Sequence, residues 1–303
     1  MSEPDNFGSY IDIDKYEPLW NKIGGIISAL VKAAAGVGIL MGSDYLVAYI
    51  MFRIRLNPGF YSGVYSAASS VVAIIALFIF SRVEGFVFNR KKSDLIRFRK
   101  INVAEGWTAV LIALSLLMIV SVYMLVARWI SSFQQVVEQA VNRYDQSMEV
   151  YVPEVVYPKW DQVLYAVSMF LLVPVAEEFT FRGIIYGAIN RRLNGAWAII
   201  LSASVFGIMH GLSVHIGYAL ISGVMIGLAY YAFDSIFVTI IIHGIFNFFG
   251  SAIFYFADVL GISHNNLPSM FTVELIATVP AMALLFTAVG KRRNQNRESL
   301  KAV

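Results

Sequence analysis

About eight long apolar runs cross this sequence, and they limit its fold more than any other feature. A transmembrane helix rises ~1.5 Å per residue, so about 20 apolar residues are needed to cross ~30 Å of hydrocarbon. These runs are continuous rather than alternating, and in lipid only helices and closed barrels satisfy all their backbone groups. The sequence therefore predicts an all-α, polytopic integral membrane protein with about eight transmembrane helices. We expect the spans at 26–51, 62–82, 107–129, 160–187, 196–213, 216–233, 236–256 and 271–290.

The composition excludes several other classes of protein. Hydrophobic residues make up 58% of the chain and charged residues only 14%, against roughly 25% charged in a soluble domain. A soluble enzyme would have to expose much of this apolar excess, and a disordered chain would need high charge and low hydrophobicity. Because there is no cysteine, disulfide scaffolds, thiol catalysis and Cys-ligated metals are excluded.

Basic residues gather in three segments that predict the orientation. They are Arg82, Arg90, Lys91, Lys92, Arg97, Arg99 and Lys100, then Arg191 and Arg192, then Lys291, Arg292, Arg293, Arg297 and Lys301. Since cytoplasmic loops carry the excess of Lys and Arg, all three segments face the cytoplasm if both termini do. We interpret the segment 82–106 as a topology anchor rather than a nucleic-acid or lipid-headgroup patch, and no nucleic-acid partner is expected. The acidic first 21 residues contain no apolar signal core, which favours a bacterial plasma membrane.

These features divide the chain into four expected parts. Residues 1–22 form a cytoplasmic tail, and 23–159 form the N-terminal helices with a basic cytoplasmic loop and an outer loop. Residues 160–256 form the core that carries the candidate site, and 257–303 form the last span and a basic cytoplasmic tail.

Ionisable residues inside membrane spans are costly and indicate function by default. In the second half of the chain they form three clusters: Glu177, Glu178 and Arg182; Phe206 and His210; His243 and Asn247. Helical spacing places Glu178 and Arg182 four residues apart as an ion pair, which leaves Glu177, turned about 100° away, without a local partner. Phe206 lies on the same helical face as His210 and is expected to support its ring. Glu177, His210, His243 and Asn247 lie at comparable depths, so all four are expected to meet in one cavity.

One glutamate, two histidines and one asparagine together favour hydrolysis by activated water. Glu177 would act as general base, with His210 sharing or orienting the proton. His243 and Asn247 would donate hydrogen bonds to the oxyanion that forms on a carbonyl. The residues leave a second chemistry open, because His210, His243 and Glu177 also make a two-His, one-carboxylate set for zinc. The helical HExxH spacing of many zinc proteases is missing, which disfavours that alternative.

The three motifs, in this order on successive membrane helices, resemble the CAAX-protease and bacteriocin-processing family of intramembrane endopeptidases. This family is related to the type II CAAX prenyl endopeptidases, and the resemblance covers about residues 160–256. It implies that Glu177 and His210 activate water, that His243 and Asn247 form the oxyanion site, and that Glu178 and Arg182 support them. The family is similar to glutamate-type proteases, so the resemblance implies neither a metal nor another cofactor.

Two other classes of function remain alternatives. The first is a non-catalytic membrane regulatory or immunity protein that binds a sensor kinase or a transporter. The second is a transporter that uses Glu177 and His210 as a proton relay, although no internal symmetry of the kind found in transporters is evident. The preferred interpretation is an enzyme whose partners are the lipid bilayer and a membrane-associated peptide or protein substrate.

Overall fold

The computed structural model describes residues 19–87, 95–131, 158–211, 214–263 and 271–301, together with residues 138, 139 and 142. The described parts contain helices and no strand. The first helices are α1 (Leu19–Arg53), α2 (Ser62–Val87) and α3 (Val103–Ser131). The next run is α5 (Lys159–Val167), η2 (Ser168–Leu172), α6 (Val173–Glu178), η3 (Phe179–Tyr186) and α7 (Gly187–Asn190). Then follow α8 (Gly195–Met209), α9 (Val214–Phe233), α10 (Ile236–Asn247), η4 (Phe248–Ala252), α11 (Ile253–Leu260) and α12 (Phe271–Lys301).

Seven helical runs of the described chain are long and apolar enough to cross a membrane, which confirms the predicted fold class. The expected span at 196–213 is the exception, because α8 has only 15 residues and reaches about 22 Å. It ends where His210 caps the helix and Gly211 takes a φ of 92°, a left-handed conformation that suits glycine. His210 therefore lies at the end of a short helix. Most of the outer loop expected at 130–159 lies outside the described residues.

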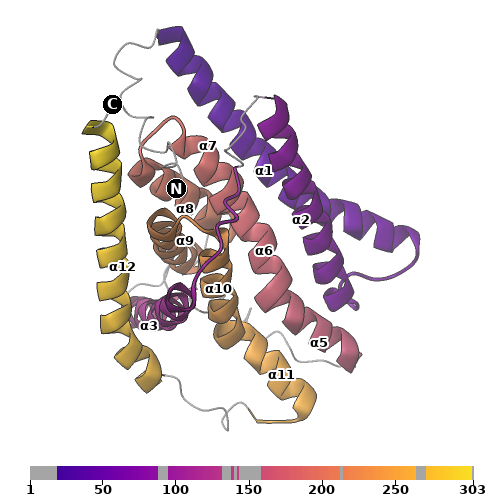
Figure 1. The fold of residues 1–303 in the computed structure, drawn as a ribbon. Helices are drawn as coiled ribbons and strands as arrows, with labels where there is room; N and C mark the ends of the chain where they lie inside the picture. The colour runs from indigo at the N-terminus through magenta and orange to yellow at the C-terminus, as the bar shows by residue number, and fades with distance from the viewer. Residues whose placement is uncertain are drawn as a thin grey trace.

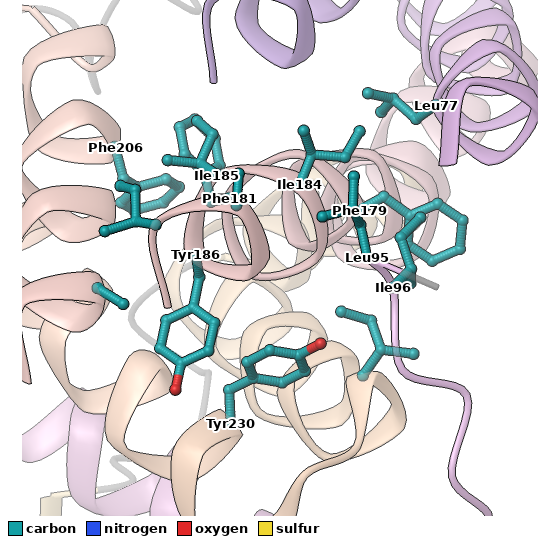
Figure 2. Packing of buried hydrophobic residues seen from close by; sticks show 14 of the residues in the cluster. Leu77, Leu95, Ile96, Phe179, Phe181, Ile184, Ile185, Tyr186, Phe206 and Tyr230 are labelled. Carbon is teal, nitrogen blue, oxygen red and sulfur yellow. The ribbon is translucent and has the colours of Figure 1, made fainter. Parts of the chain in front are cut away.

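The helices form a bundle with α12 along one side and α1 and α2 along the opposite side (Figure 1). The interior contains two main apolar clusters. One surrounds η3 and joins it to α1, α2 and α8, and the other joins α3, α9, α10 and α12. In the first cluster the rings of Phe181 and Phe206 meet edge to face at 4.9 Å, and those of Tyr186 and Tyr230 at 5.1 Å (Figure 2). Residues of 23–159 and 160–256 thus share one core.

Described residues of all three basic segments lie together at one end of the bundle, whereas Arg90, Lys91 and Lys92 lie outside the described residues. Glu84 near the end of α2 accepts from Lys32 at 2.7 Å and from Arg191 at 3.0 Å, which explains the charged Lys32 within the first apolar run. In the turn between α9 and α10, Asp234 pairs with Arg97 and with Arg292, the latter at 3.1 Å. This clustering agrees with the prediction that the basic segments share one side of the membrane.

At the other end of the bundle, α5 holds the start of α2. The first backbone N–H groups of a helix have no partner within the helix, and a side-chain carboxylate can accept from them. The buried Asp161 does so from a distant part of the chain, accepting from the N–H groups of Gly63 and Val64 at 2.9 Å each. This contact fixes α2 beside the run that carries Glu177.

Candidate active site

Three helices carry the predicted site residues. Glu177 and Glu178 end α6, His210 caps α8, and His243 and Asn247 lie on α10. π-helical stretches adjoin both α6 and α10: η2 precedes α6, η3 follows Glu178, and η4 follows Asn247. Such insertions in α-helices occur frequently at functional sites.

Pro174 accounts for the local geometry of η2. It has no N–H to donate to the carbonyl of Phe170, four residues earlier. The neighbouring backbone hydrogen bond spans five residues instead of four, because the N–H of Val173 donates to the carbonyl of Ser168. The Phe170 carbonyl faces α10, where a Cβ added to Gly244 would lie only 2.7 Å from its oxygen. Gly244 therefore permits the close approach of α10 to η2.

Asn247 uses this close approach. Its amide Nδ2 donates to the carbonyl of Met169 at 2.9 Å. The amide has a second N–H and its oxygen still available for other partners. The stretch η2, which carries Met169, thereby orients the side chain of Asn247.

The ion pair expected from helical spacing is present and fully buried. Arg182 Nη1 donates to Glu178 Oε1 at 2.8 Å, and the two side chains are 1% and 0% exposed. Arg182 Nη2 also donates to the carbonyl of Gly223 on α9 at 3.1 Å. The guanidinium lies 5.1 Å from the centre of the Phe206 ring, a distance typical of a cation–π contact. Arg182 is thus held by an ion pair, a carbonyl and an aromatic face.

His243 lies between the two glutamates, a position that the sequence did not predict. Its Nδ1 lies 2.8 Å from Glu178 Oε1 and its Nε2 lies 3.4 Å from Glu177 Oε2. The Glu178 carboxylate, paired with Arg182, can only accept, so Nδ1 of His243 is the donor. If the His243 ring carries only this one proton, its Nε2 is an acceptor. It would then face an ionised Glu177 carboxylate, which is also an acceptor. One shared proton, on His243 or on Glu177, makes this contact attractive.

His210 has a defined tautomer when its ring is neutral. Its Nδ1 lies 2.8 Å from the backbone carbonyl of Phe206, and a carbonyl can only accept, so Nδ1 carries the proton. Nε2 is left as the acceptor. The Phe206 ring contacts His210 with centroids 4.4 Å apart and also contacts His243 at 5.8 Å, so it packs against both histidines.

Glu177 and His210 both line a cavity of about 480 Å³ between the helices. His243 and Asn247 are not part of its lining; His243 instead contacts Glu177 directly. The structure therefore brings three of the four predicted catalytic residues into one continuous arrangement and places Asn247 one turn beyond His243.

The opposite wall of this cavity contains residues that sequence reasoning did not assign to the site. It is formed by α1 and α2 and is polar, with Asp44, Tyr65, Ser66, Ser69 and Ser70 among its members. Asp44 is within hydrogen-bonding reach of the Ser69 hydroxyl. The one available signal was the charge of Asp44 within an apolar run. Nothing in the sequence indicated which side chains α1 and α2 turn toward Glu177.

No group of three or more His, Asp or Glu side chains in the described parts of the chain is arranged to hold a metal ion. The zinc alternative would need Glu177, His210 and His243 to converge on one point. Instead, His243 directs one ring nitrogen to each glutamate and His210 directs Nδ1 to a backbone carbonyl.

The fold and the site together define a polytopic helical membrane protein with a carboxylate and a histidine exposed to a cavity between its helices. Residues 159–249 match the family model described as type II CAAX prenyl endopeptidase Rce1-like, which confirms the predicted resemblance to the CAAX-protease family. The match covers about three tenths of the 303 residues and contains every predicted site residue. It supports an intramembrane CAAX-type protease at the level of the family. No curated protein and no solved structure matches the chain.

Proposed function

We propose that this protein is an intramembrane endopeptidase that hydrolyses a peptide bond of a membrane-associated peptide or protein through water activated by Glu177 and His210. The observation that carries the proposal is the cavity of about 480 Å³ that exposes both side chains inside a membrane bundle. Both residues lie within the segment that matches the endopeptidase family. The alternative of a non-catalytic membrane regulator requires no such cavity.

In the proposed reaction a water molecule lies between Glu177 and Nε2 of His210. Glu177 accepts one proton from it, while Nε2 of His210 accepts a hydrogen bond from the other O–H. The oxygen bonds to the carbonyl carbon of the substrate and gives a tetrahedral oxyanion. The C–N bond then breaks, and the proton held by Glu177 passes to the leaving amine. No covalent intermediate with the protein forms.

His243 and Asn247 are proposed to stabilise the oxyanion. When His243 is protonated on both ring nitrogens, its Nδ1–H donates to Glu178. Its Nε2–H points toward Glu177, which lies 3.4 Å away and lines the cavity. The second N–H of Asn247 is the other donor, since the first is held by Met169. Preorganised donors of this kind typically contribute about 10²- to 10³-fold each to turnover. Glu178, Arg182 and Phe206 hold the histidines in place.

The experiment that tests the proposal compares peptides in membranes carrying wild-type protein with those carrying Glu177→Gln. The proposal expects at least one new terminus, within or next to a membrane segment, that is present only with the wild type. Identical peptide sets at equal protein levels would favour the non-catalytic regulator instead. A transporter would be indicated if proton-coupled uptake, rather than cleavage, depended on Glu177.

The proposed mechanism predicts that activity does not require a metal. Because the histidines are oriented by a carbonyl and by carboxylates, purified protein is expected to contain no stoichiometric zinc. Activity should survive strong chelators. Elemental analysis and cleavage assays before and after chelation measure both properties. If each chain holds one zinc ion, and if activity is lost when zinc is removed and returns when zinc is added back, the two-His, one-carboxylate zinc mechanism is supported instead.

The proposed location is a bacterial plasma membrane with both termini in the cytoplasm. The basic segments that share one end of the bundle would then face inward. Reporters fused after Val303 and within 90–100 are expected to read cytoplasmic, whereas a reporter within 138–150 should read external. A C-terminal reporter that reads external would reverse the proposed orientation.

A further inference from the structure

A second cavity, of about 870 Å³, lies at the basic end of the bundle, away from Glu177 and His210. Its walls include the turn between α7 and α8, the start of α8, the turn between α9 and α10, the C-terminal part of α12 and Arg97. Among the described residues, the charged side chains of its lining are six arginines against one aspartate, Asp234. The six are Arg97, Arg191, Arg192, Arg292, Arg293 and Arg297. The lining is therefore strongly electropositive.

Some of these arginines are held firmly by acidic partners. Asp234 pairs with both Arg97 and Arg292, and the buried Glu84 pairs with Arg191. These ion pairs fix the guanidinium groups around the cavity before any ligand arrives. A single aspartate in the lining does not neutralise the remaining positive charge.

Arg293 and Arg297 supply the exposed part of the charge. They lie four residues apart on α12, so they are neighbours on one helical face, and like charges in this arrangement repel. Neither forms an ion pair within the described residues. An anion between them would relieve this repulsion. Guanidinium groups suit a phosphate because their planar N–H fork matches two of its oxygens.

The cavity also has an apolar side. Trp197, which is 53% exposed, lines it together with Leu228 and Val289. Tryptophan is enriched where a membrane protein meets the headgroup region. A ligand that combines a phosphate with an adjoining acyl chain would contact the arginines and these apolar side chains together. Basic pockets between transmembrane helices are known to hold anionic headgroups.

We propose that this cavity is a binding site for a phosphate group, carried by an anionic phospholipid headgroup or present as free phosphate. The site is separate from the proposed catalytic cavity and does not depend on proteolysis. Its occupant would bridge α8, α12 and the α9–α10 turn; Asp234 already joins the last two through its ion pair with Arg292.

The test uses purified full-length protein in lipid nanodiscs. The probes are phosphatidylglycerol added to phosphatidylcholine, and inorganic phosphate added to phosphatidylcholine alone. The variant is Arg293→Gln with Arg297→Gln, whose exposed positions should preserve the fold. The matched control is Lys100→Gln with Lys291→Gln, which removes the same charge from exposed basic residues outside the cavity lining.

We expect affinity for the bound phosphate group to fall on the order of tenfold in the arginine variant, while the control stays close to wild type. Retention of phosphatidylglycerol by native mass spectrometry identifies a lipid as the source. Saturable binding of inorganic phosphate without lipid retention identifies free phosphate. Equal losses of affinity in the variant and the control would show that only general surface charge matters, and would overturn the proposal. It would also be overturned if the wild type bound neither probe.

Discussion

Glu177→Gln is expected to abolish peptide hydrolysis and to leave the fold intact. Glutamine has nearly the same shape as glutamate, but its amide cannot take a proton from water, so turnover should fall by about 10²- to 10⁴-fold. The side chain is 17% exposed at the cavity and takes no part in the buried Glu178–Arg182 pair. Stability should therefore stay near that of the wild type.

The assay uses purified protein, the peptide identified from membranes, and thermal unfolding of the same samples. Glu274→Gln is the matched control, because Glu274 is a buried carboxylate on α12 that does not line the cavity. The control should retain cleavage. If Glu177→Gln cleaves at the wild-type rate, Glu177 is not the general base.

Glu178→Gln is expected to have its main effect on stability. This change leaves the Arg182 guanidinium buried without its anionic partner, and such a loss reaches about 3–5 kcal/mol when the pair is fully buried. The pair is 1% and 0% exposed, so the full penalty applies. Yield and thermal stability should both fall. Because Glu178 also accepts from Nδ1 of His243, the remaining folded protein should turn over more slowly as well.

A double variant separates the two roles of Glu178. Glu178→Gln with Arg182→Met removes both charges, so much of the lost stability should return. Activity should not return, since His243 still lacks its carboxylate partner. Equal stability in the single and double variants would show that the stranded charge is not the cause. A stable, inactive Glu178→Gln beside an active Glu177→Gln would exchange the roles assigned to the two residues.

The sequence predicted those features that depend on local spacing. Membrane helices follow from apolar runs of about 20 residues, and the Glu178–Arg182 pair follows from a separation of four. Phe206 was expected on the face of His210 for the same reason, and their rings are in contact. Each of these depends on neighbours within one helix.

Features that depend on packing between helices could not be predicted in this way. His243 contacts both glutamates across the packing of α10 against α6. The neighbouring approach of α10 to η2 is permitted by Gly244, and the one signal for η2 was Pro174. The early end of α8 depended on the φ of Gly211. The polar wall on α1 and α2 could not be predicted, because these helices are far from Glu177 in the sequence and no helical periodicity relates their side chains to it.

The cavity wall is divided between two stretches of the chain, and under the proposed mechanism this division would separate the reacting groups from the residues that select the substrate. Glu177 and His210 belong to the segment that matches the endopeptidase family, whereas Asp44 and the serines opposite them lie outside it. Asp161 joins the two stretches through backbone groups of α2, a contact that does not depend on which side chains face the cavity. Under the proposed mechanism, substitutions on α1 and α2 would change the range of accepted substrates while Glu177 and His210 remain untouched. A lineage of such proteins could acquire new targets by altering its first two helices alone.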